Sequence, residues 1–373
     1  TRPLRNSSGT GDFEENFIKF YTPLNGGYPG NPPNATLGIS KTSGSLGNSI
    51  QLPYYKVISD NKDLTFSPKI FFDDNVLLQT EYRQKNKNSE LITDQSINFN
   101  DNSTRSHFFG NFKTSTETSE YQINLESTSN KNYLKKYEVV SPLIDDNMNL
   151  NSFISFEKDF DDSYFSTSFE VFEDLTKDDT DSYEYIYPNY YFNKQINSNK
   201  PGSLEFSTSG YQKKYDTSKY DAVVVNDIKY RSLQNISRRG SINNFSFVLK
   251  NLNTDGENST NHDNNLKNKF LASLQIDTKH PMKKETDSYL KYLTPKASFK
   301  FSPTETKNIR NDEISVNYLD LFNINRFNDN QMLEGGESIT LGLDYTSRSK
   351  KNDKGLGLSI GQVYRVSENN DLP

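Results

Sequence analysis

The chain has 373 residues, no cysteine and no tryptophan, and a formal net charge of −6. The missing cysteines exclude disulfides and thiolate metal sites within this chain, and the acidic balance argues against the basic face that a nucleic-acid binder shows. We therefore expect neither a nucleic-acid partner nor a cofactor. The length is compatible with two or three ordinary domains or with one large all-β unit.

Hydropathy leaves one kind of membrane protein open. The mean hydropathy is −0.86, and the longest apolar run, Ala222 to Val225, is far too short for a transmembrane helix. A transmembrane β-barrel stays compatible with these values, because its strands are apolar on one face only and its lumen and loops are polar.

Residues 1–34 are predicted to be irregular. The stretch Tyr28 to Pro33 is rich in proline and glycine, which is typical of a turn or linker. We expect a continuous sheet to begin near residue 35 and to extend to residue 373.

The first strands of that sheet are predicted within residues 51–83. Apolar and polar residues alternate there in three short runs, and the runs are separated by Asp60-Asn61 and by Asp73-Asp74-Asn75. Alternation with period two between polar turn clusters is typical of an antiparallel meander.

Two of these strands contain proline, at Pro53 and Pro68. Proline has no N–H to donate to a neighbouring strand, so sheets confine it to edges, strand ends or bulges. The local pattern favours strand ends next to turns. The alternative is a functional boundary between two strands that are joined by few hydrogen bonds.

The same alternation recurs to the end of the chain. It predicts about fifteen strands of about ten residues, the length that a tilted strand needs to cross a bilayer, and no substantial helix. Tyrosine and phenylalanine gather near the strand ends, as in the aromatic girdles of barrels. A soluble β-protein with aromatic cross-strand pairs is the alternative. The clearest alternating runs are 121–126, 165–171, 204–207, 245–250, 296–301, 338–345 and 355–361.

No catalytic or metal site is predicted. The three histidines, His107, His262 and His280, lack the spacing of metal ligands and are interpreted as surface residues. The acidic runs 170–174 and 178–181 lack the glycine and closing glutamate of a calcium loop, so we interpret them as solvated loop charges. An enzymatic function would rest on these acidic loops alone.

Six motifs follow one another along the chain, at residues 52–55 with 61–68, 132–137, 293–297, 321–327, 333–338 and 361–365. This ordered set resembles the LptD family, the outer-membrane lipopolysaccharide-assembly proteins. The opening hairpin is similar to the start of the family's barrel, and five further motifs follow at similar intervals. Lys56 departs from the family, which usually has an aromatic residue there, and the cysteines that tie some members to a periplasmic domain are missing.

The resemblance implies an all-β fold: an antiparallel transmembrane β-barrel with a polar lumen, in the outer membrane of a Gram-negative bacterium. Residues 1–34 would be a linker or the tail end of a periplasmic β-domain. Residues 35–373 would supply the N-terminal and central strands, with the last strands of the barrel missing. The implied partners are lipopolysaccharide, an LptE-like plug lipoprotein, periplasmic bridge proteins of lipopolysaccharide transport and outer-membrane lipids.

Family members release lipopolysaccharide sideways between parting strands, and this changes the interpretation of Pro53 and Pro68 to that of a lateral gate. Two interpretations of the 326–336 motif stay open. Arg326, Phe327, Glu334, Gly335 and Gly336 either shape the lumen or seat a plug lipoprotein, or they form a hairpin with a Gly-Gly turn. The sequence favours the hairpin. A general diffusion porin and a secreted soluble adhesin or structural protein are the alternative functions.

Overall fold

The structure is a computed structural model, and it describes residues 18–19, 36–41, 48–72, 75–99, 105–177, 181–196, 201–216, 218–310, 316–352, 354–367 and 370–372. Most of the predicted linker at residues 1–34, the Asp73-Asp74 turn and residues 178–180 of an acidic run lie outside the described residues. Among the described residues, no helix is long and apolar enough to cross a membrane.

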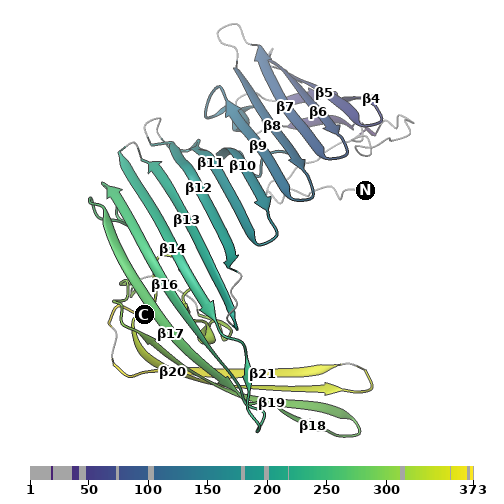
Figure 1. The fold of residues 1–373 in the computed structure, drawn as a ribbon. Coiled ribbons are helices and arrows are strands. Elements are labelled where there is room, and N and C mark those ends of the chain that lie inside the picture. The colour runs from purple at the N-terminus through teal and green to yellow at the C-terminus, as the bar shows by residue number, and fades with distance from the viewer. Residues whose placement is uncertain are drawn as a thin grey trace. The chain divides into compact units, whose positions relative to one another are not determined.

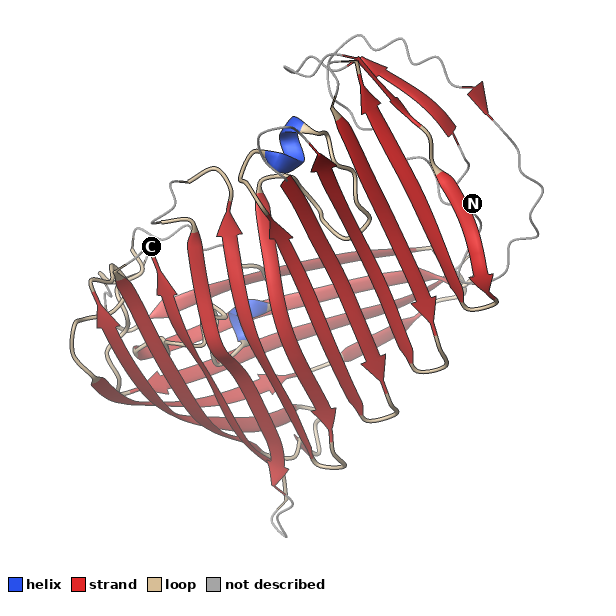
Figure 2. Ribbon diagram, turned by 90° about the horizontal axis from the view of Figure 1, so that it is seen from above, coloured by secondary structure: helices blue, strands red, loops and turns tan. Residues whose placement is uncertain are grey.

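Almost every described element is a β-strand (Figure 2). The strands of the first half are β1 (Ile18–Lys19), β2 (Thr36–Lys41), β3 (Asn48–Gln51), β4 (Tyr54–Ser59), β5 (Lys62–Phe71), β6 (Val76–Lys85), β7 (Ser89–Phe99), β8 (Arg105–Ser115), β9 (Ser119–Thr128), β10 (Asn149–Asp159) and β11 (Ser163–Asp174). The later strands are β12 (Tyr183–Ile196), β13 (Ser203–Tyr215), β14 (Lys219–Arg231), β15 (Asn235–Ile236), β16 (Ile242–Glu257), β17 (Lys267–Lys279), β18 (Met282–Glu285), β19 (Tyr289–Ser302), β20 (Gly336–Ser349) and β21 (Gly355–Arg365). The described helices are one turn of α-helix, α1 (Tyr133–Lys136), and one 3-10 turn, η1 (Asp320–Phe322).

The chain divides into two compact units: residues 1–159, 166–189 and 213–219, and residues 160–165, 190–212 and 220–373. In the first unit, sequential strands from β5 to β10 pair antiparallel with their neighbours. In the second unit, β14, β16, β17, β19, β20 and β21 pair antiparallel in that order (Figure 1). These ladders confirm the predicted all-β antiparallel fold.

In the second unit, β20 shows apolar residues on one face and buried polar residues on the other. On β20, Ile339 and Leu341 are 42% and 48% exposed, whereas Ser338 and Thr340 between them are buried. We call the face that carries Ile339 the outer face and the face that carries Thr340 the inner face. A soluble sheet buries its apolar face, so this inverted pattern is the one expected of strands whose outer face meets lipid.

The first unit follows the same rule. On β8, Phe108 is 40% exposed on the outer face, while His107 is buried on the inner face. On β7, Asp94, Ser96 and Asn98 are all buried inward. Most polar positions of the alternating sequence therefore point inward, where Phe71, Leu77 and Phe109 add a buried apolar cluster.

Candidate functional site

The inner face of the second unit is covered by the connection between β19 and β20. We call residues 303–335 the second inner segment; the structure describes 303–310 and 316–335 of it. Its hydrogen bonds reach strands that are far apart in the sheet: Asn330 Nδ2 lies 2.8 Å from Ser209 Oγ on β13, and Gln275 Nε2 on β17 lies 2.7 Å from the Phe322 carbonyl oxygen.

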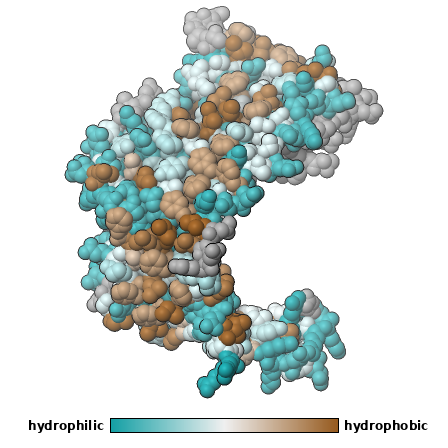
Figure 3. Space-filling view, viewed as in Figure 1, coloured by the Kyte–Doolittle hydropathy of each residue, from teal (hydrophilic) through white to brown (hydrophobic). Residues whose placement is uncertain are grey.

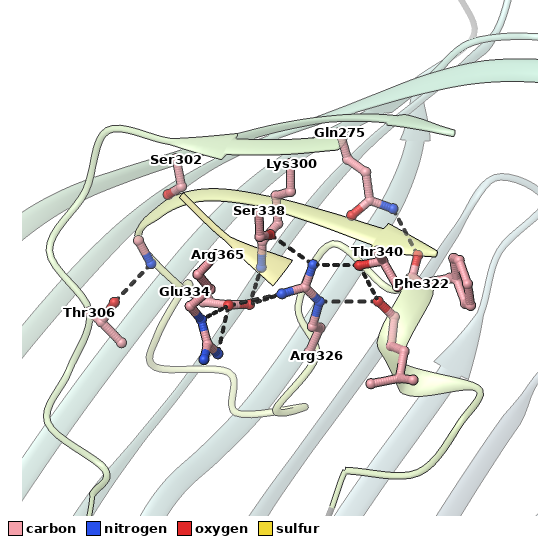
Figure 4. Close-up of polar contacts among 12 residues, drawn as sticks. Gln275, Lys300, Ser302, Thr306, Phe322, Arg326, Glu334, Ser338, Thr340 and Arg365 are labelled. Carbon is pink, nitrogen blue, oxygen red and sulfur yellow. Dashed lines mark hydrogen bonds and ion pairs between the residues drawn. The ribbon is translucent and has the colours of Figure 1, made fainter. Parts of the chain in front are cut away.

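The centre of this contact is a buried carboxylate surrounded by cations (Figure 4). Glu334 pairs with Lys300 of β19. Arg326 Nη1 lies 2.9 Å from both Glu334 oxygens, and Arg365 Nη2 of β21 lies 3.0 Å from Oε1. Glu334 thus ties its own segment to two strands at once.

Arg326 has partners for every guanidinium nitrogen. Nη2 donates to Ser338 Oγ and Thr340 Oγ1 on β20, both at 2.9 Å, and Nε donates to the Leu321 carbonyl oxygen at 3.1 Å. The side chain of Arg326 is 3% exposed. A planar, fully bonded arginine of this kind fixes the geometry of the groups around it.

Electrostatics keep Glu334 ionised. Burial alone would raise its pKa, but the charges of Lys300 and Arg326 outweigh burial and hold the pKa below the usual value of 4.5. Three cations share this one carboxylate, so its loss would leave buried charge without compensation.

Glycines on β20 and β21 provide the seat for the η1 turn. Gly342 and Gly361 are directly paired across the two strands. A Cβ atom at Gly342 would stand 2.5 Å from Phe322 Cζ, and one at Gly361 would stand 3.0 Å from Leu321 Cδ1. The second inner segment can approach the sheet this closely only where side chains are missing.

Beside this seat, the segment is also tied by Tyr318. Its hydroxyl lies 2.5 Å from Asp344 Oδ1 of β20, and Asp344 also pairs with Lys296 of β19. Burial, with the neighbouring Asp344, raises the pKa of Tyr318 to about 12, so the hydroxyl stays a neutral donor.

The structure brings together some of the residues predicted in the 326–336 motif. Arg326 and Glu334 form the cluster, while Phe327 packs against Ile309, Met332 and Leu372. Gly335 lies where a side chain would collide with the Thr304 carbonyl oxygen, and Gly336 has a φ of +87°. The pair starts β20 and does not form a two-residue hairpin turn, because β19 and β20 are joined by the whole second inner segment.

Two members of the cluster, Lys300 and Arg365, were not predicted as site residues. Lys300 was visible as a charged residue at an inward position of the alternating run 296–301, and Arg365 ends the 361–365 motif. Neither position by itself indicated the shared partner Glu334, since that contact spans three separate elements.

A first inner segment, residues 129–148, covers the inner face of the first unit and contains α1. Tyr133, Leu134 and Tyr137 pack against Phe71 and Phe109 of the strands beneath. Tyr137 Oη lies 2.9 Å from Asn98 Oδ1, and Lys69 Nζ lies 3.1 Å from the Tyr137 carbonyl oxygen. Burial raises the pKa of Tyr133 to about 12, which keeps this packing neutral.

The interpretation of the histidines as surface residues was wrong for His107. Its side chain is fully buried on β8, and Nδ1 lies 2.6 Å from Ser96 Oγ, with Nε2 3.5 Å from Asp94 Oδ1. Tyr133 Oη caps Ser96 at 2.8 Å. This Ser-His-Asp set is sealed under α1, so we assign it to holding the first inner segment.

The other histidines are also engaged. His262 lies between Asp221 and Gln331, with ring nitrogens 2.9 Å and 3.1 Å from their side-chain oxygens, and its side chain is 9% exposed. His280 Nδ1 lies 3.0 Å from Ser241 Oγ. Within the part of the chain that the structure describes, no group of three or more histidine, aspartate or glutamate side chains is placed to hold a metal ion.

The two prolines lie side by side, but in different settings. Pro53 lies in the break between β3 and β4, and Pro68 lies inside β5. The register on either side pairs Gln51 with Lys69 and Tyr54 with Phe66, which sets Leu52 opposite Pro68. These strands are not the first of the sheet, because β2 precedes them and pairs with β3.

Comparison with known proteins identifies the family. The sequence model of the LptD family, described as LPS transport system D, matches residues 103–373, which leaves the opening hairpin outside the match. The chain is also 22% identical to the LPS-assembly protein LptD of Acinetobacter baylyi over 90% of its own length and 44% of that protein. The chain therefore spans less than half the length of that relative.

Among solved structures, a bacterial polysaccharide outer membrane secretin aligns over 86% of this chain and 92% of its own, with a TM-score of 0.27 and 9% identity. A similarity this low carries no argument about function. The family match covers most of the chain, and it agrees with the inverted apolar and polar faces of the sheet. The chain belongs to the LptD family, and it is thus an outer-membrane protein of a Gram-negative bacterium.

Proposed function

We propose that this chain forms part of a translocon that inserts lipopolysaccharide into the outer leaflet, with a lateral gate at Pro53 and Pro68. The observation that carries the gate is the pairing of Leu52 with Pro68. Leu52 N donates to the Pro68 carbonyl oxygen at 3.0 Å, so the backbone polar groups of Pro68 face Leu52. Pro68 has no N–H to return, and this pair has one bond where an ordinary pair has two.

Pro53 weakens the other side of the same strand. Its nitrogen faces away from β5, because neighbouring residues of a strand point their backbone groups to opposite sides. The β2–β3 register, with Gly38 opposite Gln51, sets Thr36 opposite Pro53. One bond is missing toward β5, and a β2–β3 register continued to Pro53 would lack another toward β2; each such bond stabilises a seam by about 0.5–1.5 kcal/mol.

The loss of hydrogen bonds is confined to the neighbourhood of the two prolines. Toward the turn of the same hairpin, Asp63 accepts two hydrogen bonds from Arg83 at 2.8 Å and 2.9 Å and one from Tyr55 at 3.1 Å. These contacts join β4, β5 and β6 on the inner face. Opening would then begin at the prolines and stop at this Asp63 cluster.

For the lumen, we propose that the second inner segment is a plug that shapes the polar path, with Arg326 and Glu334 as its fixed point. The plug lipoprotein and the periplasmic bridge proteins implied by the family would meet this lumen and its periplasmic end. The general diffusion porin is the weaker alternative, since such a pore has no use for a seam with missing bonds.

The test replaces both prolines with alanine in the full-length protein reconstituted in bilayers. Restored bonds at Leu52 and Pro53 should slow delivery of lipopolysaccharide to the outer leaflet while barrel assembly, followed by heat-modifiable gel mobility, stays normal. The matched control is Pro295→Ala, in β19 far along the chain, which should leave delivery unchanged. Equal delivery by the Pro53→Ala/Pro68→Ala protein and the unmodified protein would remove the gate from this seam.

A further inference from the structure

On the outer face of β18 and β19, apolar side chains are followed by lysine at the next outward position of each strand. One row across these strands consists of Met282, Leu293, Tyr345 and Leu358. The next row toward the strand tips consists of Lys284, Lys291, Ser347 and Leu356. Rows on the same face are two residues apart, so the change occurs over about 7 Å.

The two lysines of the second row oppose each other directly across β18 and β19. Like charges at such positions destabilise a sheet. Within the described part of the chain, neither Lys284 nor Lys291 pairs with an acidic side chain. Lys291 Nζ lies 5.9 Å from the centroid of the Tyr289 ring. The pair carries positive charge that the described residues leave without a counter-charge.

Two neighbouring lysines, in contrast, do have an acidic partner. Lys283 and Lys350 both reach Glu285, at 3.3 Å and 2.8 Å. Glu285 is thus shared by Lys283 and Lys350, on the other side of the hairpins. It does not neutralise the charges of Lys284 and Lys291.

The tips of both hairpins continue the positive charge. They form the hydrophilic projection at the lower right of Figure 3, where β18–β21 end. Residues 282–291 and 347–354 contain three carboxylates, Glu285, Asp287 and Asp353, and seven cations, in a chain whose net charge is −6. The cations of the same stretches are Lys283, Lys284, Lys291, Arg348, Lys350, Lys351 and Lys354.

This end of the strands carries the short connections. The β20–β21 turn occupies residues 350–354, whereas the long second inner segment leaves from the opposite end of β20. In outer-membrane barrels the short turns face the periplasm. The cationic row then lies at the headgroup level of the periplasmic leaflet, directly below the apolar row.

We propose that Lys284 and Lys291, with the basic hairpin tips, bind the phosphates of anionic phospholipid headgroups in the periplasmic leaflet. Lysine near an anionic bilayer surface is attracted to it, and a long side chain can lie along apolar surface while its ammonium reaches the phosphate. The apolar row next to the lysines would contact the acyl chains of the same lipids whose headgroups the lysines bind. An acidic protein partner would have no need of it.

This inference rests on the outer-membrane location and is independent of lipopolysaccharide transport. The test uses the full-length protein in nanodiscs that contain equal amounts of phosphatidylglycerol and phosphatidylcholine. Native mass spectrometry of the lipids that stay bound gives the preference for phosphatidylglycerol. We expect Lys284→Gln/Lys291→Gln to lower this preference by about fivefold for each lysine.

Two variants make the result specific. Lys267→Gln/Lys269→Gln removes the same charge at the opposite end of β17 and should keep the preference. Lys284→Arg/Lys291→Arg retains the charge and should also keep it, which separates charge from any effect on folding. An unchanged preference in Lys284→Gln/Lys291→Gln, or an equal loss in the Lys267 and Lys269 control, would overturn the proposal.

A loss of periplasmic protein binding with intact lipid preference would assign the surface to an acidic protein and would also overturn it. The lateral-gate proposal and the lipid-binding proposal can be contradicted independently of each other. Lipopolysaccharide delivery reports on the gate, and bound phosphatidylglycerol reports on the lysine row.

Discussion

The two inner segments are held on the inner faces of their units by different forces. The first is held by rings: Phe71 and Tyr137 meet edge to face with centroids 6.0 Å apart, and neutral hydroxyls bond to Ser96 and Asn98. The second is held by charge, with Glu334 at the centre of three cations. Apolar packing tolerates changes in pH and salt, whereas a buried ion cluster depends on every member. We therefore expect different sensitivities in the two units.

The largest effect is expected from Glu334→Gln. The amide keeps the shape of the side chain but removes the negative charge, so Lys300, Arg326 and Arg365 are left around a neutral group. Breaking a buried ion pair by removing one partner costs about 3–5 kcal/mol. The second inner segment should detach, which trypsin cleavage at Arg326 and hydrogen exchange over 316–335 would measure.

The control for this variant is Glu337→Gln. Glu337 is three residues farther along the chain and exposed on the outer side of β20. It should change neither trypsin cleavage nor hydrogen exchange. Equal protection of Arg326 in Glu334→Gln and in the unmodified protein would show that packing, and not charge, holds the second inner segment.

A smaller effect is expected from Tyr137→Phe in the first unit. The ring packing stays, and the lost bond to Asn98 costs about 0.5–1.5 kcal/mol. Hydrogen exchange of residues 133–139 should rise modestly and by the same factor at low and high salt. A strong salt dependence there would mean that charged contacts, such as that of Lys69 with the Tyr137 carbonyl oxygen, hold the first inner segment more than ring packing does.

The smallest effect is expected from mild acid. The pKa of Glu334 is lower in the folded protein than its usual 4.5, because Lys300 and Arg326 outweigh burial. A lowered pKa stabilises the folded state fully above pH 4.5, and this stabilisation is lost as pH falls through the folded value. Each pH unit changes such a one-proton contribution by at most about 1.4 kcal/mol.

Protection of the second inner segment should thus be constant between pH 7 and 5 and should fall below 4.5. The first inner segment serves as the internal reference in the same experiment. Loss of both segments together on acidification would mean that they unfold as one and that the contrast between them is thermodynamically irrelevant.

The sequence predicted the strands well because alternation is a local signal. The run 338–345 lies within β20, and 355–361 lies within β21, as predicted. The outward apolar face was also expected once a barrel was considered, since the alternating positions left polar residues inside. Strands with weaker alternation, such as β7 and β8, carried too mixed a pattern to be singled out.

The inner segments could not be derived in this way. Contacts such as Lys300 to Glu334 depend on how a long connection folds back over the sheet, and no local pattern encodes that path. His107 shows the same limit: a lone histidine looked exposed, and its partners Asp94 and Ser96 are brought to it by the register of β7 and β8. The resemblance to the family supplied Arg326 and Glu334, but not their geometry.

The reach of the second inner segment has a consequence for how the molecule is made. Asn330 bonds to Ser209, which was synthesised 121 positions earlier, and Arg365 joins the cluster only after β21 exists. Contacts between such distant positions form late in folding, because the loop-closure entropy must be overcome first. Closure of the Glu334 cluster therefore marks a chain whose strands from β13 to β21 are already in register, and a chain with a misplaced strand would leave its second inner segment undocked and open to proteases.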